Sequence, residues 1–160
     1  MTLLGLGVIG SSVKENEHRL PLHPEHLPLL DADLRDRITL EHGYAARFGV
    51  SDADLAGHVA GFASREQILA GSDVVLLPKP QHSDVAALSP HQVLWGWPHA
   101  VQDPALTQLA IDRELTLVAF EAMNHWTPRR TGRAARLPQE QRAGGLLLGP
   151  PGPAARRAHR

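Results

Sequence analysis

The 160-residue chain is 42% hydrophobic and 21% charged, which suits one packed domain and excludes wholesale disorder. It has no cysteine and no apolar run near the roughly 20 residues of a membrane-spanning helix, so we exclude disulfides, thiol chemistry and sulfur-bound zinc, and expect a soluble cytoplasmic protein. The net charge of −1 averages two unlike segments, because residues 1–126 carry 16 acidic against 8 basic residues, whereas residues 127–160 carry 8 arginines against Glu140 alone.

The first 126 residues alternate between short apolar runs and amphipathic segments. In chain order, the predicted elements are a strand over Leu3–Ile9, a helix over Pro24–Asp31, a strand over Arg37–Glu41, a helical turn capped by residues 51–54, a helix over Ser64–Ala70, strands over Asp73–Leu77 and Val93–Trp97, a helix from Pro104 to about Glu114, and a strand over Thr116–Phe120. Ser64 and Gln67 form a capping-box pattern, and Gly71 predicts the end of that helix. Asp103 precedes a proline at a first helical position. This alternation predicts an α/β fold, a parallel sheet of about five strands flanked by helices, as in Rossmann- or flavodoxin-like catalytic domains.

Residues 127–160 differ from the rest of the chain. They contain five glycines and five prolines, and their one apolar patch is Leu146–Leu148. Such a segment lacks a periodic apolar face that could offset the entropy of ordering it, so we predict a disordered basic tail. An arginine-rich arm can bind phosphates, but the tail has no aromatic residue for base stacking, which argues against nucleic-acid binding.

Arg19 lies in the charged loop that follows the first predicted strand. In parallel α/β sheets, ligands bind where strands end and loops begin. The guanidinium of Arg19 is a planar fork that matches a carboxylate with two hydrogen bonds. The alternative is a solvated loop whose charges pair with one another.

Lys79 stands between two prolines at the end of the predicted strand Asp73–Leu77. Proline stiffens the backbone on both sides, so little further entropy is lost in aiming the ammonium group. The chain has only two lysines against 14 arginines, which makes this lysine conspicuous. A solvent-facing loop charge is the competing interpretation.

His99 ends the segment Trp95-Gly96-Trp97-Pro98-His99, directly after another predicted strand. An imidazole beside aromatic walls can transfer a proton near neutral pH. Nine other histidines weaken this signal. Four of them lack the spacing of a metal site and are interpreted as surface or capping residues: His18, His23, His26 and His42.

The order of these segments over about residues 5–126 resembles a known family. A strand is followed by KENEHRLPLHPEHL, then by strands ending in PKP and WGWPH, then by TLVAFEAM. This pattern resembles the N-terminal domain of the alanine dehydrogenase and pyridine nucleotide transhydrogenase family. The GWPH segment is most similar to N5-(carboxyethyl)ornithine synthases and related opine-type dehydrogenases.

The resemblance implies roles for four residues. Arg19 matches the family arginine that binds the substrate carboxylate, and Lys79 matches the lysine at the substrate's carboxylate and carbonyl. His99 matches the histidine proposed as proton donor and acceptor, and Glu121 falls near a family glutamate at the cleft edge. The implied substrate is a 2-oxo acid such as pyruvate, reductively aminated with NADH or NADPH. The prolines around Lys79 and the Trp-Pro before His99 depart from alanine dehydrogenases and favour the opine-like subgroup.

The family's dinucleotide-binding domain has no counterpart in the sequence. Gly5 to Gly10 match the Gly-x-Gly-x-x-Gly pattern, but they lie in the first predicted strand and not between a strand and a helix. We therefore assign no cofactor-binding residues and no metal ligands, expect no tight binding of NAD or NADP, and expect no dehydrogenase activity from this chain alone.

The abrupt change after Trp126 to Arg, Ala, Gly and Pro is typical of GC-rich coding sequence read out of frame. We hypothesise a truncated or frameshifted product, with a substrate domain over residues 1–126 and a tail over 127–160. It would be inert, or would depend on a separate nucleotide-binding chain or an oligomer. The alternatives are a non-catalytic binding module that uses the basic tail for a partner or nucleic acid, and a destabilised fragment.

Overall fold

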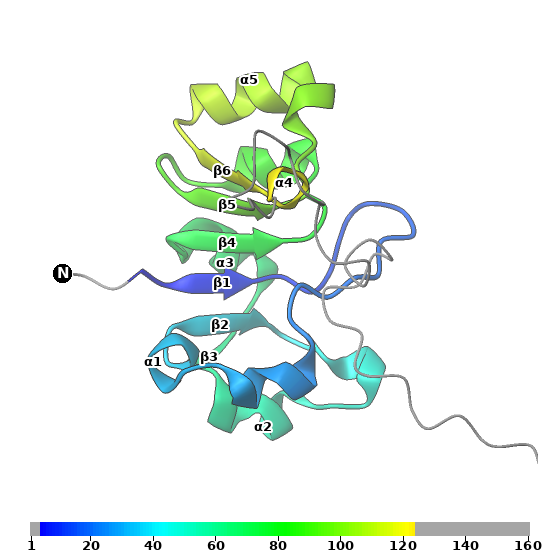
Figure 1. Ribbon diagram of the computed structural model, residues 1–160, viewed down its shortest axis with the longest axis vertical. Helices are drawn as coiled ribbons and strands as arrows, with labels where there is room; N and C mark the ends of the chain where they lie inside the picture. Colours follow the sequence, from blue (N-terminus) through cyan, green and yellow to red (C-terminus); the bar gives the residue numbers. More distant parts are fainter. Residues whose placement is uncertain (1–3, 124–160) are drawn as a thin grey trace, which may run out of the picture.

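A six-stranded parallel sheet with the order β3-β2-β1-β4-β5-β6 forms the centre of the molecule (Figure 1). The computed structural model describes residues 4–123. The strands are β1 (Leu6–Val8), β2 (Ile38–Glu41), β3 (Gly61–Ala63), β4 (Val74–Leu77), β5 (Val93–Gly96) and β6 (Thr116–Ala119). The chain winds outward in one direction from β1 and in the other from β4, so the carboxyl ends of these two strands mark the switch point where such sheets bind ligands.

Five short α-helices and several 3-10 turns connect the strands. The helices are α1 (Ala32–Arg35), α2 (Asp52–Leu55), α3 (Arg65–Gly71), α4 (His82–Ala87) and α5 (Pro104–Asp112). Turns of 3-10 helix span Pro24–Leu29, Ala46–Phe48, Ala56–His58, Ala100–Gln102 and Phe120–Ala122. No helix within residues 4–123 has both the length and the apolar character needed to cross a membrane.

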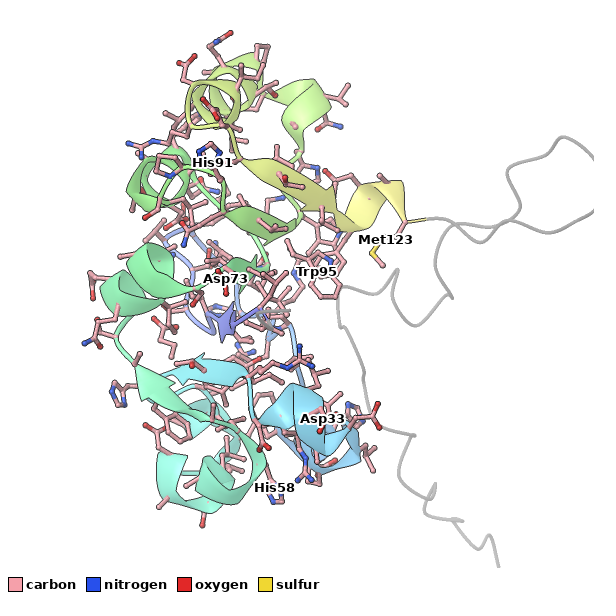
Figure 2. All side chains as sticks on the ribbon, turned by 90° about the vertical axis from the view of Figure 1, so that its left-hand side faces the viewer. Asp33, His58, Asp73, His91, Trp95 and Met123 are labelled. Atoms are coloured by element: carbon pink, nitrogen blue, oxygen red, sulfur yellow. The ribbon has the colours of Figure 1, made fainter. Side chains whose placement is uncertain are left out.

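The core has two parts because alternate residues of each strand point to opposite faces of the sheet. Val75 and Leu77 of β4 pack with α3, α4 and α5, whereas Leu76 packs with the 3-10 turn over Pro24–Leu29 and with α2. Figure 2 shows α3, α4 and α5 on one side of the sheet and α1 on the other. The two layers leave the loops at the carboxyl ends of β1, β4 and β5 next to one another.

The predicted fold class is confirmed, with corrections to its elements. The sheet has six strands where about five were predicted, and the strand that was missed is the short edge strand β3. The segment predicted as a helix over Pro24–Asp31 is 3-10 over Pro24–Leu29, since Pro28 lacks the N–H that an α-helical bond would use. Helices α1 and α4 were also missed. The tail over 127–160 lies outside the described residues, and the boundary at residue 126 stays a prediction.

Candidate functional site

Lys79 is held at the carboxyl end of β4. Pro78 and Pro80 on either side of it are buried, while Lys79 itself is half-buried. Its carbonyl accepts hydrogen bonds from Ser12 Oγ at 3.5 Å and Gln81 Nε2 at 3.4 Å. These contacts and the two prolines fix the backbone from which the ammonium group projects.

His99 is brought to Lys79 by the pairing of β4 with β5. The pairing continues past the strand ends, because Trp97 N–H donates to the Pro78 carbonyl at 2.9 Å. His99 has a left-handed backbone with φ of 50°, and its N–H donates to Glu121 Oε1 at 2.9 Å. This conformation is uncommon for a residue with a side chain and here aims the imidazole at the lysine.

Lys79 Nζ lies 2.9 Å from His99 Nε2. An ammonium group can only donate, so with Lys79 charged, His99 Nε2 accepts and the ring proton is on Nδ1. That nitrogen lies 3.9 Å from Glu121 Oε1. The arrangement can move a proton between an ammonium, an imidazole and a reacting group placed beside them.

Lys79 and His99 line a cavity of about 200 Å³ at the carboxyl edge of the sheet, together with Trp97 and Asp103. Lys14 also lines it, so both lysines of the chain face one cavity. Two ammonium groups beside an imidazole suit a small anionic ligand. The sequence reasoning missed Lys14, although its rarity as a lysine could have marked it.

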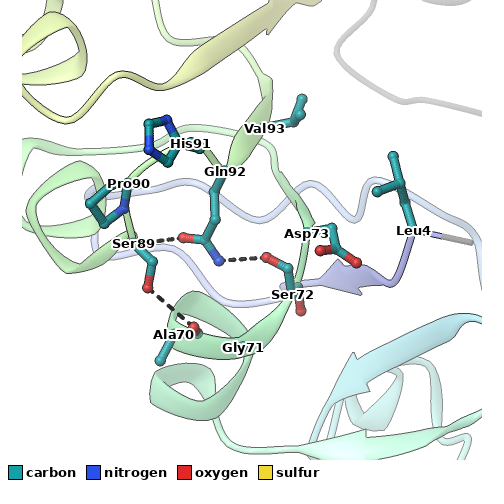
Figure 3. Close-up of a pocket in the computed structure, with 10 residues that line it drawn as sticks. All are labelled: Leu4, Ala70, Gly71, Ser72, Asp73, Ser89, Pro90, His91, Gln92 and Val93. Atoms are coloured by element: carbon teal, nitrogen blue, oxygen red, sulfur yellow. Dashed lines mark hydrogen bonds between the residues drawn. The ribbon is translucent and has the colours of Figure 1, made fainter. Parts of the chain in front are cut away.

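Two other cavities, each of about 310 Å³, have no lysine in their linings. One lies at the amino edge of the sheet (Figure 3). There the side chain of Gln92 is held by the Ser89 N–H and the Ser72 carbonyl, and Ser89 Oγ donates to the Ala70 carbonyl. Its polar groups therefore serve the fold, and the smaller cavity is the better candidate site.

Arg19 reaches this site through Trp97. Its guanidinium stacks on the Trp97 ring at 4.4 Å from the centroid, and Trp97 lines the cavity. The same guanidinium pairs with the Glu17 carboxylate. The pairing predicted by the solvated-loop alternative is thus present, but the Glu17 side chain is only 7% exposed, so the loop is not simply solvated.

The structure therefore brings some of the four predicted residues into contact, but not all of them. Lys79 and His99 are in contact, and Glu121 binds the backbone of His99. Arg19 does not line the cavity itself, but its guanidinium lies over the ring of Trp97, which does. Their roles toward a substrate stay predictions. Glu17, which holds Arg19, carried no recognisable signal in the sequence, and Trp97 was recognised as an aromatic neighbour of His99 but not as a partner of Arg19.

The glycines at β1 do not fit a dinucleotide. A Cβ on Gly7 would lie 2.2 Å from Ser72 Oγ, and one on Gly10 would lie 2.8 Å from the Tyr44 ring, so both glycines serve close packing. The N–H groups of Gly10 and Ser11 both donate to Glu41 Oε2, at 2.9 and 2.7 Å. The amides that would cradle a pyrophosphate are taken by the chain's own carboxylate. Residues 4–123 also hold no group of three or more acidic or histidine side chains placed for a metal ion.

The fold and this edge of the sheet define a Rossmann-like α/β domain with a cationic small-ligand cavity. Residues 8–137 match the family model of the alanine dehydrogenase/PNT N-terminal domain, and the chain belongs to that family. The resemblance seen in the sequence is thereby confirmed at the level of the family.

Two solved structures share the fold. One is an L-alanine dehydrogenase, with a TM-score of 0.65 and 22% identity over 80% of this chain and 35% of that one. The other is a transhydrogenase from Sinorhizobium meliloti, with a TM-score of 0.62 and 16% identity over 76% of this chain and 36% of that one. This chain thus spans about a third of the length of each. No curated protein sequence matches it.

Proposed function

We propose that this chain is the substrate-binding part of an NAD(P)-dependent amino-acid or opine-type dehydrogenase that reductively aminates pyruvate. Within that class, we propose that the chain is most similar to carboxyethylornithine synthases. The observation that carries the proposal is the contact of Lys79 with His99 in a small cavity at the carboxyl edge of the sheet. Membership of the family supports the class of reaction. A chain without cysteine suits the reducing cytoplasm, where we place it.

The chemistry follows from the three groups. Arg19 binds the carboxylate of the 2-oxo acid. Lys79 donates a hydrogen bond to the carbonyl oxygen and makes the carbon more electrophilic toward an amine. His99 accepts the proton that the amine loses when it attacks and returns it to the resulting hydroxyl, which leaves as water to give the imine that the hydride reduces. The reducing electrons would come from a nicotinamide cofactor. Because the Gly10 and Ser11 amides are already bonded to Glu41, we propose that this chain is inactive alone and depends on a separate nucleotide-binding chain.

The alternative function, a binding module acting through the basic tail, depends on residues 127–160, which lie outside the described part of the chain. The carboxylate site can be tested without it. A ligand-observed NMR titration of the full chain with pyruvate measures binding directly and requires no cofactor.

Replacement of Arg19 by alanine should weaken pyruvate binding by about tenfold to hundredfold, because a hydrogen bond to a charged group contributes roughly 1.5–3 kcal/mol. Arg47→Ala is a matched control, since Arg47 also lies over an aromatic ring, 5.1 Å from the Phe48 centroid, but Phe48, unlike Trp97, does not line the cavity. Equal losses in both variants, or no binding to the unchanged chain, would contradict the proposal.

A further inference from the structure

The guanidinium of Arg19 is fixed on two sides. Its Nε donates to Glu17 Oε1 at 2.8 Å, and its Nη2 donates to Glu17 Oε2. The Arg19 backbone N–H donates to the same Oε1 at 2.9 Å. The guanidinium carbon lies over the Trp97 ring, 4.4 Å from its centroid. The Glu17 carboxylate and the Trp97 indole therefore together fix the orientation of the guanidinium.

This fixation leaves one edge of the fork for a ligand. Glu17 takes the Nε and Nη2 side, and Nη1 has no hydrogen-bond partner within residues 4–123. A carboxylate can still bind end-on, across Nη1 and the second proton of Nη2. Without Glu17, the same side chain could present either edge, and the rotamers of a long arginine would have to be ordered on binding.

Glu17 is held firmly enough to act in this way. Its side chain is 7% exposed against 29% for Arg19, so the carboxylate is the more buried partner. The hydrogen bond from Arg19 lowers the pKa of Glu17, and the charge of Lys79 adds to this. Displacing Glu17 would leave a buried carboxylate unpaired, which is costly. Glu17 is therefore a fixed part of the site and not a placeholder that the substrate removes.

We infer that Glu17 is a positioning residue: with Trp97, it fixes Arg19 so that the Nη1 edge of the guanidinium meets the carboxylate of a 2-oxo acid. The inference rests on the proposed function and deepens it, because it assigns the orientation of the substrate carboxylate to a residue that does not touch the substrate. It also gives an acidic residue beside an anion-binding group a physical role.

The sign of the effect of Glu17→Gln distinguishes this role from simple electrostatics. Removing a negative charge near an anion site should tighten pyruvate binding if charge alone mattered. A positioning role predicts the opposite, a several-fold weaker affinity in the full chain, because the amide can accept at only one oxygen. Glu15→Gln is the matched control, since it removes the same charge from an exposed glutamate of the same loop, and it should leave the affinity unchanged or slightly tighter.

Two further readouts accompany the titration. The NMR signal of the Arg19 Nε–H should exchange slowly in the unchanged chain and quickly in Glu17→Gln, while the melting temperatures stay close. Trp97→Leu removes the stacking ring and should also weaken binding, which keeps the test valid if Glu17→Gln folds poorly.

The outcomes separate the two proposals. Equal or tighter pyruvate binding by Glu17→Gln, with loss of binding in Arg19→Ala, would overturn the role of Glu17 and leave the proposed function standing. No pyruvate binding to the unchanged chain would overturn the proposed function, and the role of Glu17 with it.

Discussion

Asp84→Ala should destabilise the fold by about 3–5 kcal/mol, the usual cost of removing one partner from a buried ion pair. Asp84 is 3% exposed, and its Oδ1 accepts from Arg65 Nη2 at 2.6 Å. Its Oδ2 accepts from the Gln81 N–H at 2.8 Å and so begins α4. The substitution would remove the nearest carboxylate from Arg65, whose side chain is 16% exposed, and leave it Ser11 and the Glu41 carboxylate at 4.0 Å. It would also loosen the loop that carries Lys79.

Chemical denaturation of the full chain followed by circular dichroism measures this loss. Asp54→Ala is a matched control, because Asp54 holds the same third position of a capping box at α2 but is exposed. It should cost much less. The double variant Asp84→Ala with Arg65→Met should lose less stability than the sum of the two single variants, since both single substitutions break the same ion pair. Equal effects of Asp84→Ala and Asp54→Ala would contradict the argument.

Gly96→Ala should destabilise the chain by about 1–3 kcal/mol or more, as overpacking of a filled interior does. A Cβ at Gly96 would lie 1.9 Å from the Leu77 carbonyl oxygen and 3.1 Å from its carbon, so backbone must move. Leu77 and Gly96 are paired at the ends of β4 and β5. The strands would separate where they lead into Lys79 and His99, and the hydrogen bond between these side chains should be lost.

The control for Gly96→Ala is Gly61→Ala in β3, where no atom lies within 4 Å of the added Cβ. That variant should be neutral or slightly more stable, because alanine restricts the unfolded chain more than glycine does. Thermal unfolding gives the stabilities, and the ¹⁵N shift of His99 Nε2 reports the contact with Lys79. A Gly96→Ala variant as stable as Gly61→Ala, with an unchanged His99 signal, would show that Gly96 does not lie against the Leu77 carbonyl.

Most strands and the capped helices could be predicted from local chemistry. The apolar run at Val74–Leu77 and the segment Thr116–Ala119, which contains a threonine and a valine, have the composition of strands. Ser64 with Gln67 forms the predicted capping box, and Asp103 accepts from Leu106 N–H as an N-cap should. These signals involve residues three apart and need no tertiary information.

The missed elements depend on tertiary contacts. Helix α4 begins at Gln81, a poor capping residue, and is held by the ion pair of Asp84 with Arg65 across 19 positions of the chain. Strand β3 has only three residues and forms by pairing with β2. Neither the ion pair nor the pairing has a local signature.

The site residues likewise fall into those with a local sequence signal and those that depend on tertiary contacts. Lys79 and His99 could be found because each follows a strand, and parallel strands end at one edge. Glu17 looked like one charge among several, and the need for glycine at position 96 arises only from the Leu77 carbonyl of the neighbouring strand.

A crystal structure of the full chain grown with pyruvate tests the central claim most directly. The account predicts one pyruvate between Arg19 and the cavity, with its carboxylate on the Nη1 edge of Arg19, its carbonyl oxygen within hydrogen-bond distance of Lys79 Nζ, and His99 still in reach. Pyruvate bound at another surface, or an empty cavity at pyruvate concentrations that saturate the crystal, would contradict it.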